Sequence, residues 1–96
     1  MNYRPLPEHL TIKKSKIEGL GLFALKDIEK GVNSGITHIT DPITNKLFRT
    51  PLGGFINHSE EPNAKLVEVQ RFRYLYFLRD IKKDEEITLK YTMYSV

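Results

Sequence analysis

The stretch Ala64–Asp80 constrains the fold of this chain more than any other, because its side chains alternate with a period of two. Successive side chains of a β-strand point to opposite faces, and aromatic and β-branched residues favour strands. One face is largely apolar and carries Phe72, Tyr74, Tyr76 and Leu78. The other is mixed and carries Arg71, Arg73, Leu75, Phe77 and Arg79. No window of about eleven residues or more has convincing helical periodicity, so a mainly β fold is predicted.

Shorter segments on either side of this stretch are also typical of strands. Their apolar and β-branched residues are bounded by glycine, proline and polar turn residues. Strands are predicted at Leu10–Lys14, Leu22–Lys26, Ile36–Ile39 and Ile87–Leu89, and turns at Asp27–Gly31, Asp41–Asn45 and Lys82–Glu85. We expect the turn-rich stretch Asp41–Asn45 to project from the surface.

Length and composition indicate one folded domain, residues 1–96, with its core at about 11–91. The chain is 40% hydrophobic and 28% charged, which is typical of a soluble globular protein. It has no apolar run of the roughly 18 residues needed to cross a membrane, and no secretory signal. It also lacks the cysteines of disulfides and thiolate zinc sites. An intracellular protein without a membrane partner is therefore expected.

The charged and histidine residues indicate no further binding site by themselves. The net charge of +3 is too small to predict nucleic-acid binding. His9, His38 and His58 do not have the spacing of metal ligands, so no metal site is predicted. A solvated surface of mixed charge is the simpler interpretation.

Two short motifs could carry chemistry. Gly19-Leu20-Gly21 is a bend that allows a ligand close to the backbone, but taken alone it favours a plain turn. Asn57-His58-Ser59 is more specific, because an amide that donates and accepts suits an adenine edge or the amine and carboxylate of an amino acid. Taken alone, His58 would be a structural histidine. Adjacent histidine and serine side chains on an extended chain point apart, which argues against a hydrolytic pair.

Three blocks in this order resemble the SET-domain family of protein lysine methyltransferases. They are residues 19–24, residues 54–63 with the turn Pro62-Asn63, and residues 84–91, which end on a tyrosine. The resemblance runs from about Thr11 to Tyr91, and the small viral members of the family are similar in length. It implies a SET-like fold of the β-clip type, S-adenosyl-L-methionine as the cofactor, and transfer of a methyl group to a lysine of a protein, such as a histone or another basic protein.

The resemblance also implies which residues form the site. The glycine bend would hold the methionine part of the cofactor, and His58 would act largely through its backbone. Tyr91 would be the catalytic residue, orienting the substrate amine by a hydrogen bond. The implied cofactor-binding residues are Lys16, Gly19, Leu20, Gly21, Leu22, Asn57, His58 and Tyr91. The acidic pair Glu85-Glu86 is interpreted as turn and strand-edge structure.

The sequence departs from the family pattern at several places. Gly54 and Ser59 stand where an arginine and a cysteine are common, and 31–38 and the vicinity of Leu66 lack tyrosines that other members carry. The insert before the Asn-His block is reduced to about Thr40–Thr50. Only five residues follow Tyr91 in this sequence, so we expect the segment that closes the lysine channel in other members to be absent. We therefore expect the apolar residues near this end, Tyr91, Met93, Tyr94 and Val96, to pack against a second copy, as a homodimer, or against the substrate protein.

Two other functions stay open. One is a non-catalytic binding module that keeps the SET fold. The other is a basic β-domain that binds nucleic acid through Arg71, Phe72, Arg73 and Tyr74. The simpler interpretation of those four residues, a sheet with an apolar face and a charged rim, is favoured over nucleic-acid binding.

Overall fold

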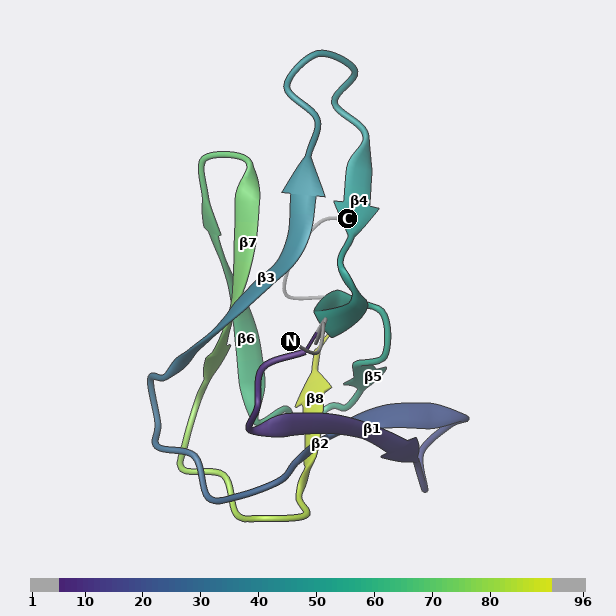
Figure 1. Ribbon diagram of the computed structural model, residues 1–96, viewed down its shortest axis with the longest axis vertical. Coiled ribbons are helices and arrows are strands. Elements are labelled where there is room, and N and C mark those ends of the chain that lie inside the picture. Colours follow the sequence, from purple (N-terminus) through teal and green to yellow (C-terminus); the bar gives the residue numbers. More distant parts are fainter. Residues whose placement is uncertain (1–5, 91–96) are drawn as a thin grey trace, which may run out of the picture.

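Two small sheets form the protein in a computed structural model, of which we describe residues 6–90 (Figure 1). The strands are β1 (Leu10–Lys14), β2 (Leu20–Ala24), β3 (Asn33–Thr40), β4 (Leu47–Arg49), β5 (Asn57–His58), β6 (Ala64–Val69), β7 (Phe72–Phe77) and β8 (Glu86–Leu89). Within residues 6–90 the only helix is a single 3₁₀ turn, η1 (Pro51–Gly53). The mainly β fold predicted from the sequence is confirmed.

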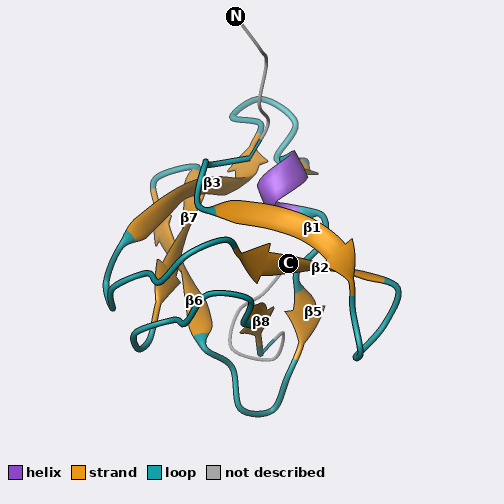
Figure 2. Cartoon of the chain, turned by 60° about the horizontal axis from the view of Figure 1, so that its bottom comes forward, coloured by secondary structure: helices purple, strands orange, loops and turns teal. Residues whose placement is uncertain are grey.

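The first sheet has the strand order β1-β2-β8-β5, and the second has the order β4-β3-β7-β6. In the second sheet, β6 and β7 form a hairpin that accounts for the long alternating stretch, and β3 and β4 form another. All neighbouring strands are antiparallel except β5 and β8, which run parallel. In the first sheet, β8 comes from near the end of the described chain and lies between two earlier strands (Figure 2).

The predicted strands are largely confirmed, with shifts at their ends. The first strand has the predicted bounds, whereas the second begins two residues earlier, at Leu20, within the glycine bend. The strand predicted at Ile36–Ile39 extends to Asn33–Thr40 through irregular register. The turn at Asp41–Asn45 does project from the surface, at the end of the β3–β4 hairpin (Figure 1), and Ile43 in this turn is 90% exposed.

Sequence analysis did not find β4 and β5. Both are too short to show a period of their own, and β5 consists of Asn57 and His58 alone. Their extended form comes from pairing with β3 and β8, which are distant in the sequence. The position of Asn57 therefore depends on strand β8.

The core lies between the two sheets, and strand β7 buries one of its two faces in it. Leu75 and Phe77 are fully or almost fully buried, together with Leu22 of β2 and Ile87 of β8. The face with Phe72, Tyr74 and Tyr76 is the more apolar one in the sequence, yet it is the outer face and is half-buried. Packing against the first sheet, rather than the count of apolar residues, decides which face is inside.

Candidate functional site

Strand β8 brings the two predicted motifs together. On one side it pairs antiparallel with β2, which carries the second glycine of the bend, with Leu22 opposite Ile87. On its other side it pairs parallel with β5, with Asn57 opposite Thr88. The glycine bend and the Asn-His motif therefore flank the same strand, although Gly21 and Asn57 are 36 positions apart in the chain.

The side-chain amide of Asn57 is oriented by acceptors on the glycine bend and on β8. Its nitrogen Nδ2 donates to the main-chain oxygens of Glu18, at 3.1 Å, and Leu20, at 3.4 Å. It also donates to Oγ of Ser15, at 3.0 Å, and to Oε2 of Glu86, at 2.9 Å. Carbonyl and carboxylate oxygens can only accept, so the nitrogen must face them. The donors of Asn57 are used within the protein, whereas none of the described residues donates a hydrogen bond to its Oδ1.

Glu86 is the second centre of the site. Its two carboxylate oxygens accept hydrogen bonds from Oγ of Ser15 at 2.8 and 2.9 Å. The carboxylate lies directly over Gly21, where a Cβ atom would come within 2.9 Å of Cδ of Glu86 and 3.1 Å of Cβ of Ser15. Only glycine leaves room for this close approach. Thus Gly21 is needed for the packing of Glu86.

Ser15 closes the bend that leads from β1 to β2. Its amide nitrogen donates to the main-chain oxygen of Gly19, at 2.8 Å, and its hydroxyl accepts from the amide of Ile17, at 2.9 Å. Gly19 has a φ of +47°, which glycine adopts without strain. Lys16 and Leu20 are exposed on this bend. Ser15 and Glu86 were not identified as site residues in the sequence, and the pattern offers no signal that would pair residues so far apart.

Asn63 attaches the turn after the Asn-His motif to β8. Its Oδ1 accepts from the amide of Thr88, at 2.8 Å, and its Nδ2 donates to the main-chain oxygen of Glu86, at 2.7 Å. The residue is buried, with 4% of its surface exposed. Two hydrogen bonds to one strand explain why an asparagine follows the turn proline Pro62.

The acidic pair has two separate roles. Glu85 forms an ion pair with Arg79 and also accepts a hydrogen bond from the amide of Lys82, at 3.0 Å. The hydrogen bond from the Arg79 guanidinium holds the pKa of Glu85 below its usual value. This carboxylate stabilises the turn before β8, as the sequence interpretation proposed. Glu86 points instead into the candidate site.

His58 is half-buried and lies beside a charged pair. Its Nε2 is 3.1 Å from Oε1 of Glu60, and the other oxygen of Glu60 is 3.4 Å from Nζ of Lys90. His58 and then Lys90 lower the pKa of the Glu60 carboxyl group. The backbone of His58 pairs with Leu89 in the sheet. Its ring is thus directed to a carboxylate at the edge of the site.

Most of the implied cofactor-binding residues lie near one another, with two exceptions. The side chain of Leu22 is fully buried in the core, so its side chain packs between the sheets. Tyr91 lies outside the described residues, as do Met93, Tyr94 and Val96 of the expected interface. Apolar side chains are exposed on the bend and just before Asn57, since Ile17, Leu20 and Phe55 are 52%, 51% and 37% exposed.

Among residues 6–90, no cluster of histidine and acidic side chains could hold a metal ion. No described helix is long and apolar enough to span a membrane.

Comparisons with known proteins identify relatives of this chain. The model of the SET domain family matches residues 36–92. A crystal structure of a candidate histone methyltransferase from Plasmodium falciparum is 25% identical, with a TM-score of 0.72, and the match covers 90% of this chain and 95% of that one. The methyltransferase domain of human PR domain-containing protein 2 is 20% identical, with a TM-score of 0.66 and coverage of 86% and 76%.

A third similar structure is the SET domain of the RIZ1 tumour suppressor, at 21% identity and a TM-score of 0.70. Here the match covers 92% of this chain and 72% of the other. A comparison with curated protein sequences found no match.

Proposed function

Because the chain belongs to the SET-domain family, we propose that it transfers a methyl group from S-adenosylmethionine to a lysine side chain of a protein. The arrangement of Asn57 is the observation that supports this most directly. Its amide is held against the glycine bend by four acceptors, which leaves Oδ1 as a preorganised acceptor. An acceptor of this kind suits the ammonium group or the adenine amine of the cofactor.

The surface around Oδ1 also fits such a ligand. Leu20 and Phe55 supply exposed apolar area, which suits the flat adenine ring. A ligand could approach the main chain of the glycine bend closely at Gly19, where an added Cβ would meet no atom within 4 Å. S-adenosylmethionine, when bound, supplies an electrophilic methyl group on a positively charged sulfur.

The remaining task for the protein is to prepare the lysine amine. With a pKa near 10.4, only about one lysine in 2,500 is neutral at pH 7, and only the neutral nitrogen can form the new bond to carbon. An apolar channel would favour the neutral form by desolvation. Tyr91 would accept or donate a hydrogen bond to orient the amine, and the proton of the ammonium group would leave to solvent.

The cofactor part of this proposal can be tested by thermal unfolding with S-adenosylhomocysteine, the product that remains after transfer. A ligand that binds only the folded protein raises its melting temperature. Asn57→Ala should weaken binding by about 1–3 kcal/mol, since a buried polar interaction is lost. No shift at millimolar ligand, in a sample confirmed to be folded, would contradict cofactor binding.

The matched control is Asn45→Ala. Asn45 has a φ of +60° in the β3–β4 turn, so alanine destabilises the fold there without touching the site. This variant should keep the ligand-induced shift of the wild type, although its melting temperature is lower. The control separates loss of the site from loss of stability.

A non-catalytic binding module is the second candidate. Leu66, in the region where other members carry a channel tyrosine, has no hydroxyl group and packs against the core. Both candidates predict ligand binding, but only the enzyme transfers methyl groups. Mass spectrometry of a mixture of lysine-containing proteins after incubation with S-adenosylmethionine distinguishes them. Ligand binding without any methylated lysine would favour the binding module.

A further inference from the structure

The outer face of the second sheet, on the opposite side of that sheet from the core, carries a row of half-buried aromatic side chains. Phe72, Tyr74 and Tyr76 lie on it in a row along β7. They are flanked by Val69 and Val67 of β6, which stand opposite the first two rings, and by Ile39 of β3, which stands opposite Phe72. All six side chains are half-buried or exposed. We call this surface the aromatic face.

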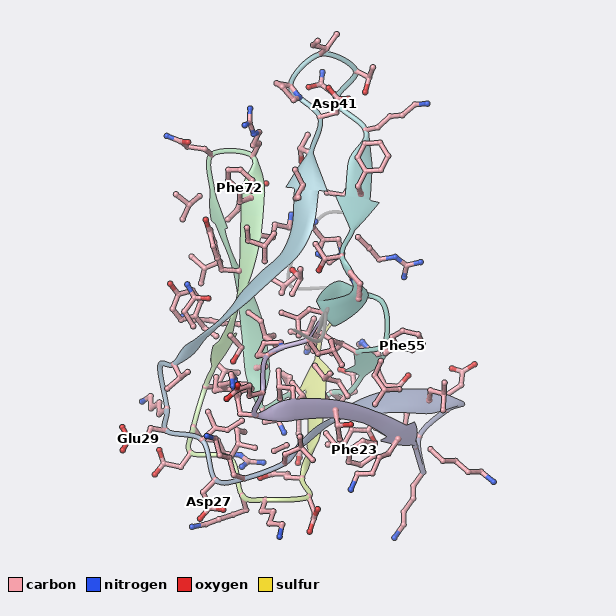
Figure 3. The ribbon with its side chains drawn as sticks, viewed as in Figure 1. Phe23, Asp27, Glu29, Asp41, Phe55 and Phe72 are labelled. Atoms are coloured by element: carbon pink, nitrogen blue, oxygen red, sulfur yellow. The ribbon has the colours of Figure 1, made fainter. Side chains whose placement is uncertain are left out.

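A hollow lies at each end of the aromatic face. The first has a volume of about 530 Å³ and is lined by Tyr76 together with Lys30 and Lys65. The second has a similar volume, about 530 Å³, and is lined by Phe72, Phe48 and Arg71. Each hollow therefore combines an aromatic ring of β7 with one or two cations. Figure 3 shows Phe72 and Asp41 at the same end of the sheet.

The charges around the aromatic face are mostly positive. The guanidinium carbon of Arg71 is 5.2 Å from the centre of the Phe72 ring. The carboxylate in that hollow, Asp41, accepts hydrogen bonds from the amides of Ile43, at 2.8 Å, and Thr44, at 3.3 Å, which with the nearby Arg71 lower its pKa. Asp41 therefore offsets part of the charge of Arg71, and the two lysines of the first hollow are the main cations. Glu68 is directed to the other face of the sheet, where its carboxylate is 3.6 Å from Nε of Arg73.

The structure thus changes which residues could act together. The sequence interpretation grouped Arg71, Phe72, Arg73 and Tyr74. Arg73 lies on the opposite face, as the alternation predicts, whereas Arg71 packs on the Phe72 ring, and Tyr76, Lys65 and Lys30 lie on or beside the aromatic face. The rings of Phe72 and Tyr74 are 6.3 Å apart and tilted by 52°, so each presents its own surface.

We propose that the aromatic face binds single-stranded nucleic acid, with bases stacked on the rings of β7 and phosphates near Lys30, Lys65 and Arg71. Rows of exposed aromatic side chains on a sheet bind unpaired bases, and neighbouring cations bind the backbone. A second copy of the chain fits less well, because the same three cations would meet their own counterparts across a two-fold axis. This binding is separate from the Asn57 site and does not depend on methyl transfer.

Fluorescence anisotropy with labelled 12-nucleotide oligothymidylate and oligouridylate tests the proposal on the full chain at low salt. Tyr74→Ala should weaken binding between about fivefold and a hundredfold, the range for loss of one stacked base. Lys65→Gln should weaken it and reduce the slope of log affinity against log salt by about 0.7. The control Lys82→Gln, an exposed lysine in the turn before β8, should leave both quantities close to wild type.

Three results would overturn the proposal. The first is that the labelled oligonucleotides do not bind at about 100 µM protein. Another is binding that Tyr74→Ala leaves unchanged, which would show a purely electrostatic attraction. The last is a dimer in light scattering that Tyr74→Ala dissociates, which would assign the aromatic face to protein association. A thermal shift with S-adenosylhomocysteine, retained by Tyr74→Ala, shows that the variant is folded.

Discussion

Nδ2 of Asn57 lies 2.9 Å from Oε2 of Glu86, which joins strands β5 and β8 through their side chains beside the glycine bend. The same carboxylate accepts from Ser15, so one acidic group fixes an amide and a hydroxyl at once. Hydrogen bonds to a charged acceptor are stronger than those between neutral groups. The orientation of Asn57 therefore depends on Glu86 as much as on its own backbone.

The first prediction concerns Glu86. Glu86→Gln replaces one accepting oxygen by a donor that faces the amide of Asn57 or the hydroxyl of Ser15. We expect the free energy of unfolding to fall by about 1–3 kcal/mol, measured by urea denaturation. The control is Glu29→Gln, at an exposed carboxylate on the loop between β2 and β3, which should change stability by less than about 0.5 kcal/mol (Figure 3).

The contribution of the hydrogen bond between Ser15 and Glu86 to stability can be measured independently. In a double-mutant cycle, Ser15→Ala combined with Glu86→Gln should deviate from additivity by about 0.5–3 kcal/mol, because the two side chains contact each other. Additive effects of the two substitutions would show that this hydrogen bond does not contribute to stability.

The second prediction concerns the close approach at Gly21. The Cβ of Gly21→Ala would overlap the Glu86 carboxylate, so we expect destabilisation of about 1–3 kcal/mol and a weaker thermal shift with S-adenosylhomocysteine. Gly54→Ala is the matched control. Its φ is −81°, and the nearest atoms to an added Cβ are 3.7 Å away. Equal losses of stability in both variants would mean that Glu86 moves aside freely.

The third prediction is a loss of stability in mild acid. Burial is the main cause that lowers the pKa of His38, with further contributions from Arg73 and Arg49, and burial also lowers the pKa of His9. Below an unfolded pKa of about 6.5, the unfolded chain binds more protons at these sites than the folded protein. The stability that the two neutral histidines contribute should therefore be fully present above about pH 6.5 and should decrease as the pH falls below it.

Urea denaturation between about pH 7.5 and 5.5 checks this, since carboxylates with ordinary pKa values near 4 change little in that range. The double variant His9→Gln/His38→Gln should show a flatter dependence on pH than the wild type, and each single variant should lie between them. An unchanged slope in the double variant would assign the dependence to other groups.

The fourth prediction concerns the proposed catalytic tyrosine. Tyr91→Phe should lower the rate of methyl transfer about 10²-fold or more, which is the range for positioning and acid–base groups. The affinity for S-adenosylhomocysteine should change little. Single-turnover kinetics and thermal shifts measure the two quantities separately. A variant that transfers methyl groups at the wild-type rate would show that the hydroxyl of Tyr91 has no part in the reaction.

The sequence alone is sufficient to predict those strands whose own residues show a recognisable pattern, such as the alternation of side chains. The alternation in 64–80 predicts the extended structure of β6 and β7, although not the turn at Gln70 that divides them, and Leu10–Lys14 is predicted with its observed bounds. The turn at Asp41–Asn45 follows from its proline and polar residues, whose preferences are local. The order of the three motifs was enough to indicate the SET-domain family, which the match over residues 36–92 confirms.

Tertiary structure alone decided which residues meet at the site and which face of β7 is buried. Ser15 and Asn57 are 42 positions apart in the chain, and Ser15 and Glu86 are 71 apart, so no local pattern could relate them. Strand β5 exists because β8 provides its hydrogen-bonding partners. Glu86 contacts Asn57 because β8 lies between β2 and β5, and Leu75 rather than Tyr74 is buried because the first sheet covers that side. Such contacts depend on how distant strands pair, and a period of two in one strand carries no information about its neighbours.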